Sequence, residues 1–279
     1  MKVGVFLYAT DLGWPPIEIA RAAENRGIES LFLCEHSHVP APPEVYRDPA
    51  GRALPEYYSR LHDPLISLAA MAVATSTLIL GTAVCVIAQR DPVTTAKEVA
   101  TLDHAAGGRL ELGVGAGWSD AELRGHGVAP ADRFPTFARN LATMRSLWTS
   151  DSVTLAGDPG APIAMWPRPL QRPHPPVLVG GNGPHVLHRV EALGDGWLMT
   201  GSHPDLGGAL TGLRALEERL GRHLPTTVVG LAGEADELDR YADLGINRVL
   251  LTVRPGPREA IEKRLDRIAQ EGVERSHAA

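Results

Sequence analysis

Two groups of residues have the types and spacing for chemistry on a bound small molecule. Glu35 and His36 stand together after one apolar run, and Gly180–Gly183, a Gly-Gly-Asn-Gly turn, follows another. An imidazole titrates near neutral pH and transfers protons, and a neighbouring carboxylate fixes which ring nitrogen carries the proton. Glycines that lead into a helix expose backbone N–H groups that suit a phosphate. We expect His36 to act as acid or base with Glu35 as its partner, and a phosphate to bind at residues 180–183.

Each of these features also has a structural interpretation. A histidine after a strand commonly bonds a neighbouring carbonyl, and a glycine turn can join strand to helix without a ligand. Gln89 and Arg90 follow another apolar run, and Gly115, Gly117 and Trp118 follow a fourth. The glycines at 113, 115 and 117 do not have the G-x-G-x-x-G spacing, and no acidic residue stands where a nucleotide ribose needs one, so we exclude a Rossmann site.

Short apolar runs alternate with amphipathic segments along the whole chain, as in a parallel sheet with crossover helices. The expected strands are Lys2–Tyr8, Ser30–Cys34, 78–88, Leu110–Val114, Val177–Val179, Gly196–Met199, Thr227–Gly230 and Arg248–Val253. The expected helices are 15–27, Asp63–Ala74, 92–106, Phe134–Trp148, Pro184–Leu193, Leu206–Leu220, Glu234–Leu244 and Arg258–Glu271, several with proline at the start and glycine at the end.

Eight such units predict an α/β fold, a (β/α)8 TIM barrel, and the length of 279 residues suits one domain over 1–279. A six-stranded open sheet is the alternative fold. We expect insertions after strands 2 and 4: a long loop at 40–62 over the barrel mouth, and residues 150–176, in which 153–155 and 163–166 could pair as a hairpin. A barrel builds its site from the loops at the carboxyl ends of its strands, where Glu35, His36 and the glycines stand.

The composition and charge of the chain limit the classes of function to consider. A net charge of −6 without a basic run argues against nucleic-acid binding. No apolar stretch is long enough for a membrane span and the sequence starts without a leader pattern, so we expect a cytoplasmic protein. Cys34 and Cys85 lie in apolar runs and are expected to be reduced core residues.

Motifs in a fixed order resemble the luciferase-like monooxygenase superfamily, and more closely its branch of probable coenzyme F420-dependent oxidoreductases. They run through most of the chain: KVGVFLYATD, EHSHVP, LPEYYSRLHDPL, LGTAV, RDPV, AKEVATLD, GGRLELGVGAGW, PRPLQRPHPPVLVGGNG and GDGW. Singly none of these motifs is specific. Their order and spacing together make the resemblance specific.

The resemblance implies a barrel that holds coenzyme F420, with FMN as the alternative cofactor, and transfers hydride to or from a small organic substrate. It places a non-proline cis peptide between Ala83 and Val84 against the cofactor ring. It implies further cofactor contacts at Ala116 and Gly117, places the cofactor phosphate at Gly181, Asn182 and Gly183, and puts Glu35 and His36 beside the ring.

This sequence departs from the family pattern at two positions. Sugar-phosphate dehydrogenases of the superfamily have glutamate at the position of Trp118, which leaves that substrate in doubt. FMN-dependent members have an arginine near Ala116, and its absence weakens the FMN interpretation. Trp118 is expected in the substrate pocket, with Trp14, Tyr46, Tyr57 and Tyr58 as further aromatic wall.

Other functions remain as alternatives. His36 and His38 form an H-x-H pair typical of a metal-dependent hydrolase, although strand eight ends without the expected aspartate, and we predict no metal ligand. An FMN-dependent monooxygenase and a non-catalytic flavin binder are the others. A homodimer is expected from the superfamily, and no nucleic acid or membrane partner is expected.

Overall fold

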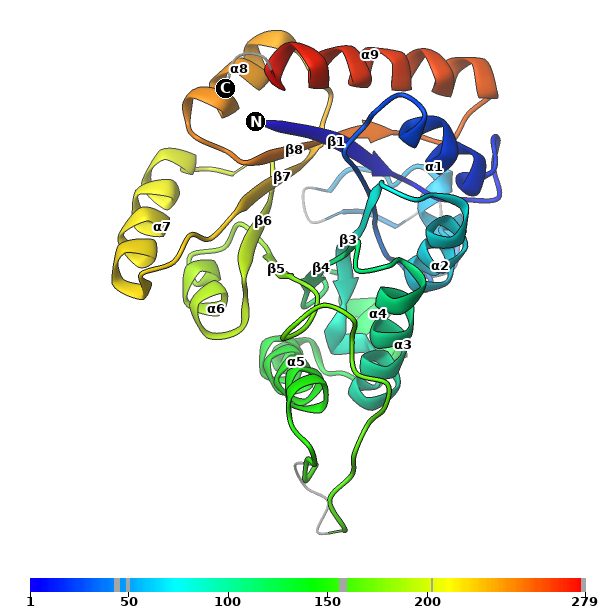
Figure 1. The fold of residues 1–279 in the computed structure, drawn as a ribbon. Coiled ribbons are helices and arrows are strands. Elements are labelled where there is room, and N and C mark those ends of the chain that lie inside the picture. Colours follow the sequence, from blue (N-terminus) through cyan, green and yellow to red (C-terminus); the bar gives the residue numbers. More distant parts are fainter. Residues whose placement is uncertain (43–45, 49–50, 156–159, 202, 277–279) are drawn as a thin grey trace.

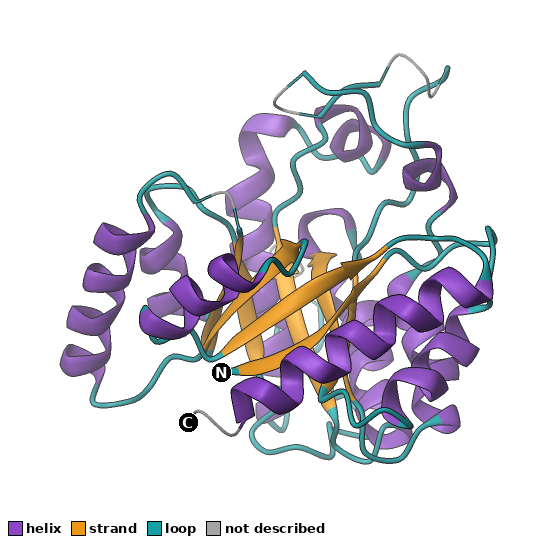
Figure 2. Ribbon diagram, turned by 90° about the horizontal axis from the view of Figure 1, so that it is seen from above, coloured by secondary structure: helices purple, strands orange, loops and turns teal. Residues whose placement is uncertain are grey.

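Eight parallel strands close into a barrel and pair in the order in which they occur along the chain. Figure 2 shows the strands at the centre of the molecule with helices around them. The computed structural model describes the chain except residues 43–45, 49–50, 156–159, 202 and 277–279, and except the side chains of residues 273–276. The strands are β1 Lys2–Leu7, β2 Ser30–Leu33, β3 Ile79–Val86, β4 Leu110–Gly115, β5 Val177–Gly180, β6 Gly196–Thr200, β7 Thr226–Leu231 and β8 Arg248–Val253. The predicted TIM barrel is thus confirmed, and the open sheet is excluded.

Helices surround this barrel and follow the strands in turn (Figure 1). They are α1 Pro16–Glu24, α2 Pro64–Ala74, α3 Pro92–Ala105, α4 Asp120–Gly125, α5 Arg133–Thr149, α6 Val186–Leu193, α7 Leu206–Leu220, α8 Ala235–Asp243 and α9 Arg258–Ser276. Side chains that accept a hydrogen bond from the first turn begin several of them: Asp63 accepts from Ile66 N at 3.0 Å and Asp91 from Thr94 N at 2.7 Å. The short helix α4 was not expected from the sequence.

Two apolar layers hold the barrel together. Inside it, Phe6, Phe32, Leu178, Leu198 and Leu250 pack against one another, each at most 5% exposed. Outside it, the second faces of the strands pack against the helix ring in a larger cluster. Because both faces of each strand are covered, the strands read as continuous apolar runs in the sequence.

An ion cluster fills the amino-terminal end of the barrel. Arg248 at the start of β8 donates to Glu111 of β4 at 2.6 Å and to Glu29 at 2.7 Å. Burial alone would lower the pKa of Arg248, but hydrogen bonds and the charges of the two carboxylates raise it. The guanidinium therefore stays charged and links strands on opposite sides of the barrel.

The two expected insertions lie at opposite ends of the barrel. Residues 34–63 connect β2 to α2 at the carboxyl end and include a 3-10 turn, η2 Glu56–Arg60. Residues 150–176 connect α5 to β5 and so lie at the amino-terminal end. In this segment the structure describes one antiparallel bridge, Val153 to Ile163, where a longer hairpin was predicted; residues 156–159 lie outside the described part. Among the described helices, none combines the length and apolar character that crossing a membrane requires.

Replacing Arg248 tests the ion cluster. We expect Arg248→Ala to lower the free energy of unfolding by about 3 kcal/mol, because it leaves the largely buried Glu111 without its cation and Glu29 with Lys2 alone. The control is Arg219→Ala, which removes the exposed pair between Arg219 and Glu191 and should change stability far less. Urea unfolding of the three proteins measures both values, and equal effects of the two substitutions would contradict this role.

Candidate active site

A cleft of about 1070 Å³ opens at the carboxyl ends of the strands. This is the end at which TIM-barrel proteins build their sites. Nine of the ten site residues expected from the sequence line it: Glu35, His36, Ala83, Val84, Ala116, Gly117, Trp118, Gly181 and Gly183. Asn182, the tenth, is not part of the lining.

Val84 forms part of the cleft wall between two glycines. The peptide bond from Ala83 to Val84 is cis, as the family resemblance implies, and the pairing of β3 with β4 shifts register between Thr82 and Cys85. A Cβ atom on Gly115 would lie 2.6 Å from one Val84 methyl group, and one on Gly180 would lie 2.7 Å from the other. Both positions therefore need glycine if Val84 is to point between them.

His36 is held by a carboxylate that the sequence analysis did not find. Its Nδ1 lies 2.9 Å from Oε2 of Glu122 in α4, and the two side chains are 8% and 1% exposed. Glu122, not Glu35, is thus the partner of the imidazole. Among the described residues Nε2 of His36 has no hydrogen-bond partner, so this nitrogen is available to a ligand in the cleft.

Glu122 is ionised in this arrangement. Burial alone would raise its pKa, but the hydrogen bond from His36, the charge of His36 and the donors of Ser37 lower the pKa below its ordinary value of 4.5. Ser37 N donates to Oε1 at 2.6 Å. The carboxylate therefore fixes the His36 ring with Nδ1 as donor.

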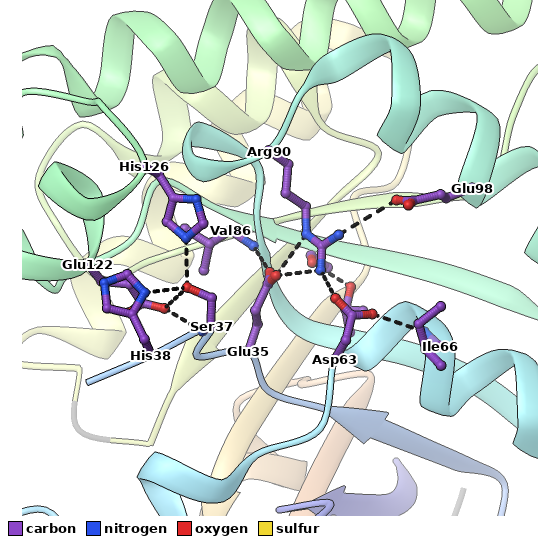
Figure 3. A network of polar contacts seen from close by, with 12 residues as sticks. Glu35, Ser37, His38, Asp63, Ile66, Val86, Arg90, Glu98, Glu122 and His126 are labelled. Atoms are coloured by element: carbon purple, nitrogen blue, oxygen red, sulfur yellow. Dashed lines mark hydrogen bonds and ion pairs between the residues drawn. The ribbon is translucent and has the colours of Figure 1, made fainter. Parts of the chain in front are cut away.

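Ser37 connects this network to two exposed histidines, His38 and His126. Ser37 Oγ lies 2.7 Å from His126 Nε2 and 2.9 Å from His38 Nδ1 (Figure 3). His36 and His38 thus have different partners and do not converge. Among the described residues no three side chains are grouped to hold a metal ion.

Glu35 joins the ends of two strands. Its carboxylate accepts from the Val86 amide and, at 2.7 Å, from Arg90 Nε, and Arg90 also pairs with Asp63 (Figure 3). Both oxygens of this buried carboxylate are used in these contacts. Glu35 therefore positions β2 against the end of β3, and the expectation that it orients His36 is wrong.

The glycine turn after β5 offers fewer free donors than expected. Helix α6 begins at Val186, two residues later than predicted, and Gly181 N donates to Leu198 O at 3.0 Å. The Asn182 amide group bonds Thr200 Oγ1 at 2.6 Å, so it joins β5 to β6. At Gly183 an added Cβ would meet nothing within 4 Å, which leaves open space beside the backbone there.

Arg189 is a cleft residue that the sequence analysis missed. It lies on the first turns of α6, and its guanidinium stacks 4.4 Å from the centre of the Phe134 ring, which also lines the cleft. Burial lowers the pKa of Arg189. In the part of the chain that the structure describes, no carboxylate pairs with it. This cation beside Gly181 and Gly183 suits the phosphate of a bound cofactor.

The cysteines do not serve as nucleophiles in this arrangement. Cys34 lines the cleft, but burial raises its pKa to about 12, and burial also raises the pKa of Cys85. Both thiols are free and stay protonated near neutral pH.

The fold and the cleft define a barrel with a ligand site at its carboxyl end. More particularly, the chain belongs to the luciferase-like monooxygenase family, whose model matches residues 16–234. It is 37% identical over 257 residues to an uncharacterized protein of Mycobacterium tuberculosis (strain ATCC 25618 / H37Rv), covering 90% of this chain and 91% of the relative.

Solved structures show the same fold. The monooxygenase RslO1 from Streptomyces bottropensis superposes with a TM-score of 0.82 at 20% identity, over 100% of both chains. An F420-dependent secondary alcohol dehydrogenase in complex with an F420–acetone adduct has a TM-score of 0.72 at 17% identity, over 96% of this chain and 97% of that one. The names of other matches include both FMN-dependent and F420-dependent enzymes.

The low pKa of Glu122 predicts a pH dependence of stability. Because the folded-state pKa lies below 4.5, ionised Glu122 stabilises the fold above that pH, and the contribution is lost as the pH falls through the folded-state pKa. Glu122→Gln should lower the free energy of unfolding by about 3 kcal/mol at pH 7 and by less near pH 3. Urea unfolding at both pH values measures this, and a loss that does not depend on pH would contradict it.

Proposed function

We propose that this protein transfers hydride between coenzyme F420 and a small organic substrate in the cleft. The observation that carries the proposal is the His36–Glu122 pair, which gives the cleft a histidine whose Nε2 is free for a ligand. When bound, the deazaflavin supplies the hydride acceptor or donor. Oxidation of an alcohol releases a proton and reduction of a carbonyl consumes one, so such a reaction needs an acid or base at this place.

The residues of the chain supply binding and proton transfer. His36 Nε2 takes or gives the substrate proton, and Glu122 stabilises the imidazolium that forms. Val84, whose methyl groups lie against Gly115 and Gly180, would hold the cofactor ring. Arg189 and the backbone at Gly183 would bind its phosphate, since the Gly181 N–H is already bonded to Leu198. Ala116 and Gly117 also line the cleft and would contact the cofactor.

FMN is the alternative cofactor, and with it the protein would be a monooxygenase. Relatives of both kinds exist in the family. Ala116 stands where the resemblance leads us to expect an arginine in FMN-dependent members, and this supports F420. Titration of the purified protein with each cofactor, followed by cofactor fluorescence, decides between them: tight binding of FMN and not F420 would overturn the proposal.

Arg189→Ala tests the phosphate contact. We expect it to weaken F420 binding about 10-fold, which corresponds to about 1.4 kcal/mol, and to leave binding of the deazaflavin riboside that lacks the phosphate unchanged. Arg139→Ala, an exposed arginine on α5, is the matched control and should change neither. Equal weakening of both ligands by Arg189→Ala would show that Arg189 does not bind the phosphate.

His36→Asn tests the proton transfer. We expect turnover of the F420-loaded protein to fall by about 10²–10⁴ while the dissociation constant of F420 stays the same. His38→Asn removes an exposed imidazole two residues away and serves as the control. A His36→Asn protein with normal turnover would rule out the proposed acid–base role.

A further inference from the structure

Apart from Phe134, which stacks on Arg189, the aromatic side chains that line the cleft lie next to one another. Phe6, Tyr8, His36, Tyr58 and Trp118 line it. The rings form a continuous series: Phe6 lies 5.0 Å from Tyr8, Tyr8 5.5 Å from Tyr58, Tyr58 5.4 Å from His36, and His36 5.3 Å from Trp118, measured between ring centres. Because these residues come from the ends of β1, β2 and β4 and from η2, four separate segments build one aromatic wall.

A second layer of rings supports this wall from outside the cleft. Tyr46 stacks on Trp118 with ring centres 5.7 Å apart and planes 17° apart, and Tyr57 stacks on Tyr58 at 5.4 Å. Trp14, expected near the mouth, lies instead beneath Arg258 and is not part of the wall. Rings that are themselves packed keep their orientation, so the wall is a preformed surface for a flat or alicyclic ligand.

The tyrosine hydroxyls of this wall are uncharged and bond each other. The hydroxyls of Tyr8 and Tyr58 lie 3.2 Å apart and bond each other. Burial raises the pKa of both tyrosines, so they stay protonated near neutral pH. Together with His36 Nε2, the Tyr58 hydroxyl is suited to bind a single oxygen atom of a ligand.

Charges on this side of the cleft are already paired. Glu35 pairs with Arg90, Glu122 with His36, and Arg52 of the lining with Asp48 at 2.7 Å. Arg60, near the same wall in η2, pairs with Asp11. An anionic substrate held against the aromatic wall would therefore lose its hydration without gaining a free cation, which is unfavourable.

The cation without a carboxylate partner, within the described lining, lies on the other side of the barrel. Arg189 follows β5, and β5 is four strands away from β1 in the closed order of eight. A group that binds Arg189 therefore lies across the cleft from Tyr8. The cleft thus has a cation for an anionic group on the side opposite Tyr8.

We propose that the substrate of this protein is an uncharged, ring-containing alcohol or its ketone, held against the aromatic wall with its oxygen between His36 Nε2 and the Tyr58 hydroxyl. This rests on the proposed hydride transfer. In the oxidative direction the carbinol C–H bond breaks, the hydride passes to oxidised F420, the O–H proton passes to His36, and the C=O bond forms. A phosphorylated sugar does not fit this side.

Binding of three probes tests the substrate class. Cyclohexanone, 4-oxocyclohexanecarboxylate and glucose 6-phosphate are titrated by calorimetry into the protein with and without F420. We expect cyclohexanone to bind at least about 10-fold more tightly than either anion. Because F420 binding is measured in the same samples, failure to bind F420 refutes the proposed function alone. Equal or tighter binding of an anion refutes the substrate class alone.

Two matched pairs of variants locate the binding surface. Trp118→Phe and Tyr58→Phe should each raise the dissociation constant of cyclohexanone several-fold. The controls Trp166→Phe, an exposed tryptophan in the 150–176 segment, and Tyr57→Phe, a ring behind the wall, should not. Thermal unfolding checks that all four proteins are folded. If the controls weaken cyclohexanone as much as the wall variants do, or if none of the variants does, the aromatic wall is not the binding site.

Discussion

The contact between His36 and Glu122 is the constraint on which the site depends. It joins the end of β2 to a six-residue helix 86 positions later in the chain, and both side chains are nearly excluded from water. A buried carboxylate without its partner is costly, so the fold holds the imidazole in one orientation. That orientation leaves one ring nitrogen for the cleft. The barrel alone would bring the strand ends together, but it would not determine which atom of His36 faces a ligand.

Arginines neutralise carboxylates at both ends of the barrel. Arg248 neutralises carboxylates at the amino-terminal end of the barrel, and Arg90 neutralises Glu35 at the carboxyl end. Arg189 lines the cleft, and no carboxylate among the described residues pairs with it, which is why we propose it as the phosphate contact. Across the cleft, the rings of Tyr8 and Tyr58 lie where the nearby charges are paired. We propose on this basis that the anionic group of a cofactor and the uncharged substrate bind in different parts of one cleft.

Much of the fold could be predicted from the sequence because its signals are local. Apolar runs mark the strands, and Pro64 and Pro92 with the preceding aspartates mark helix starts. The positions of strand ends then follow from the barrel rule, and the family resemblance indicated the cofactor contacts among them; nine of the ten expected site residues line the cleft.

The partners within the site could not be predicted in the same way. Glu122 lies in a helix too short to show a period, although Ser119 three residues earlier, whose Oγ accepts from Glu122 N at 3.1 Å, was a capping signal. Arg189 has the sequence position of a surface helix residue, and only the tertiary packing against Phe134 places it in the cleft. Glu35, adjacent to His36 in sequence, points instead to Val86 and Arg90. Adjacency along the chain is a poor guide to contact where the backbone alternates side-chain direction.

The orientation of His36 is the central claim, and nitrogen-15 NMR of histidine-labelled protein measures it most directly. The His36 signals are assigned by their loss in His36→Asn protein. The account predicts a protonated Nδ1 that is hydrogen-bonded, and an Nε2 resonance that shifts when a ligand fills the cleft while the Nδ1 resonance does not. Protonation at Nε2 with an unprotonated Nδ1 in the neutral ring, or a ligand response at Nδ1 alone, would contradict it.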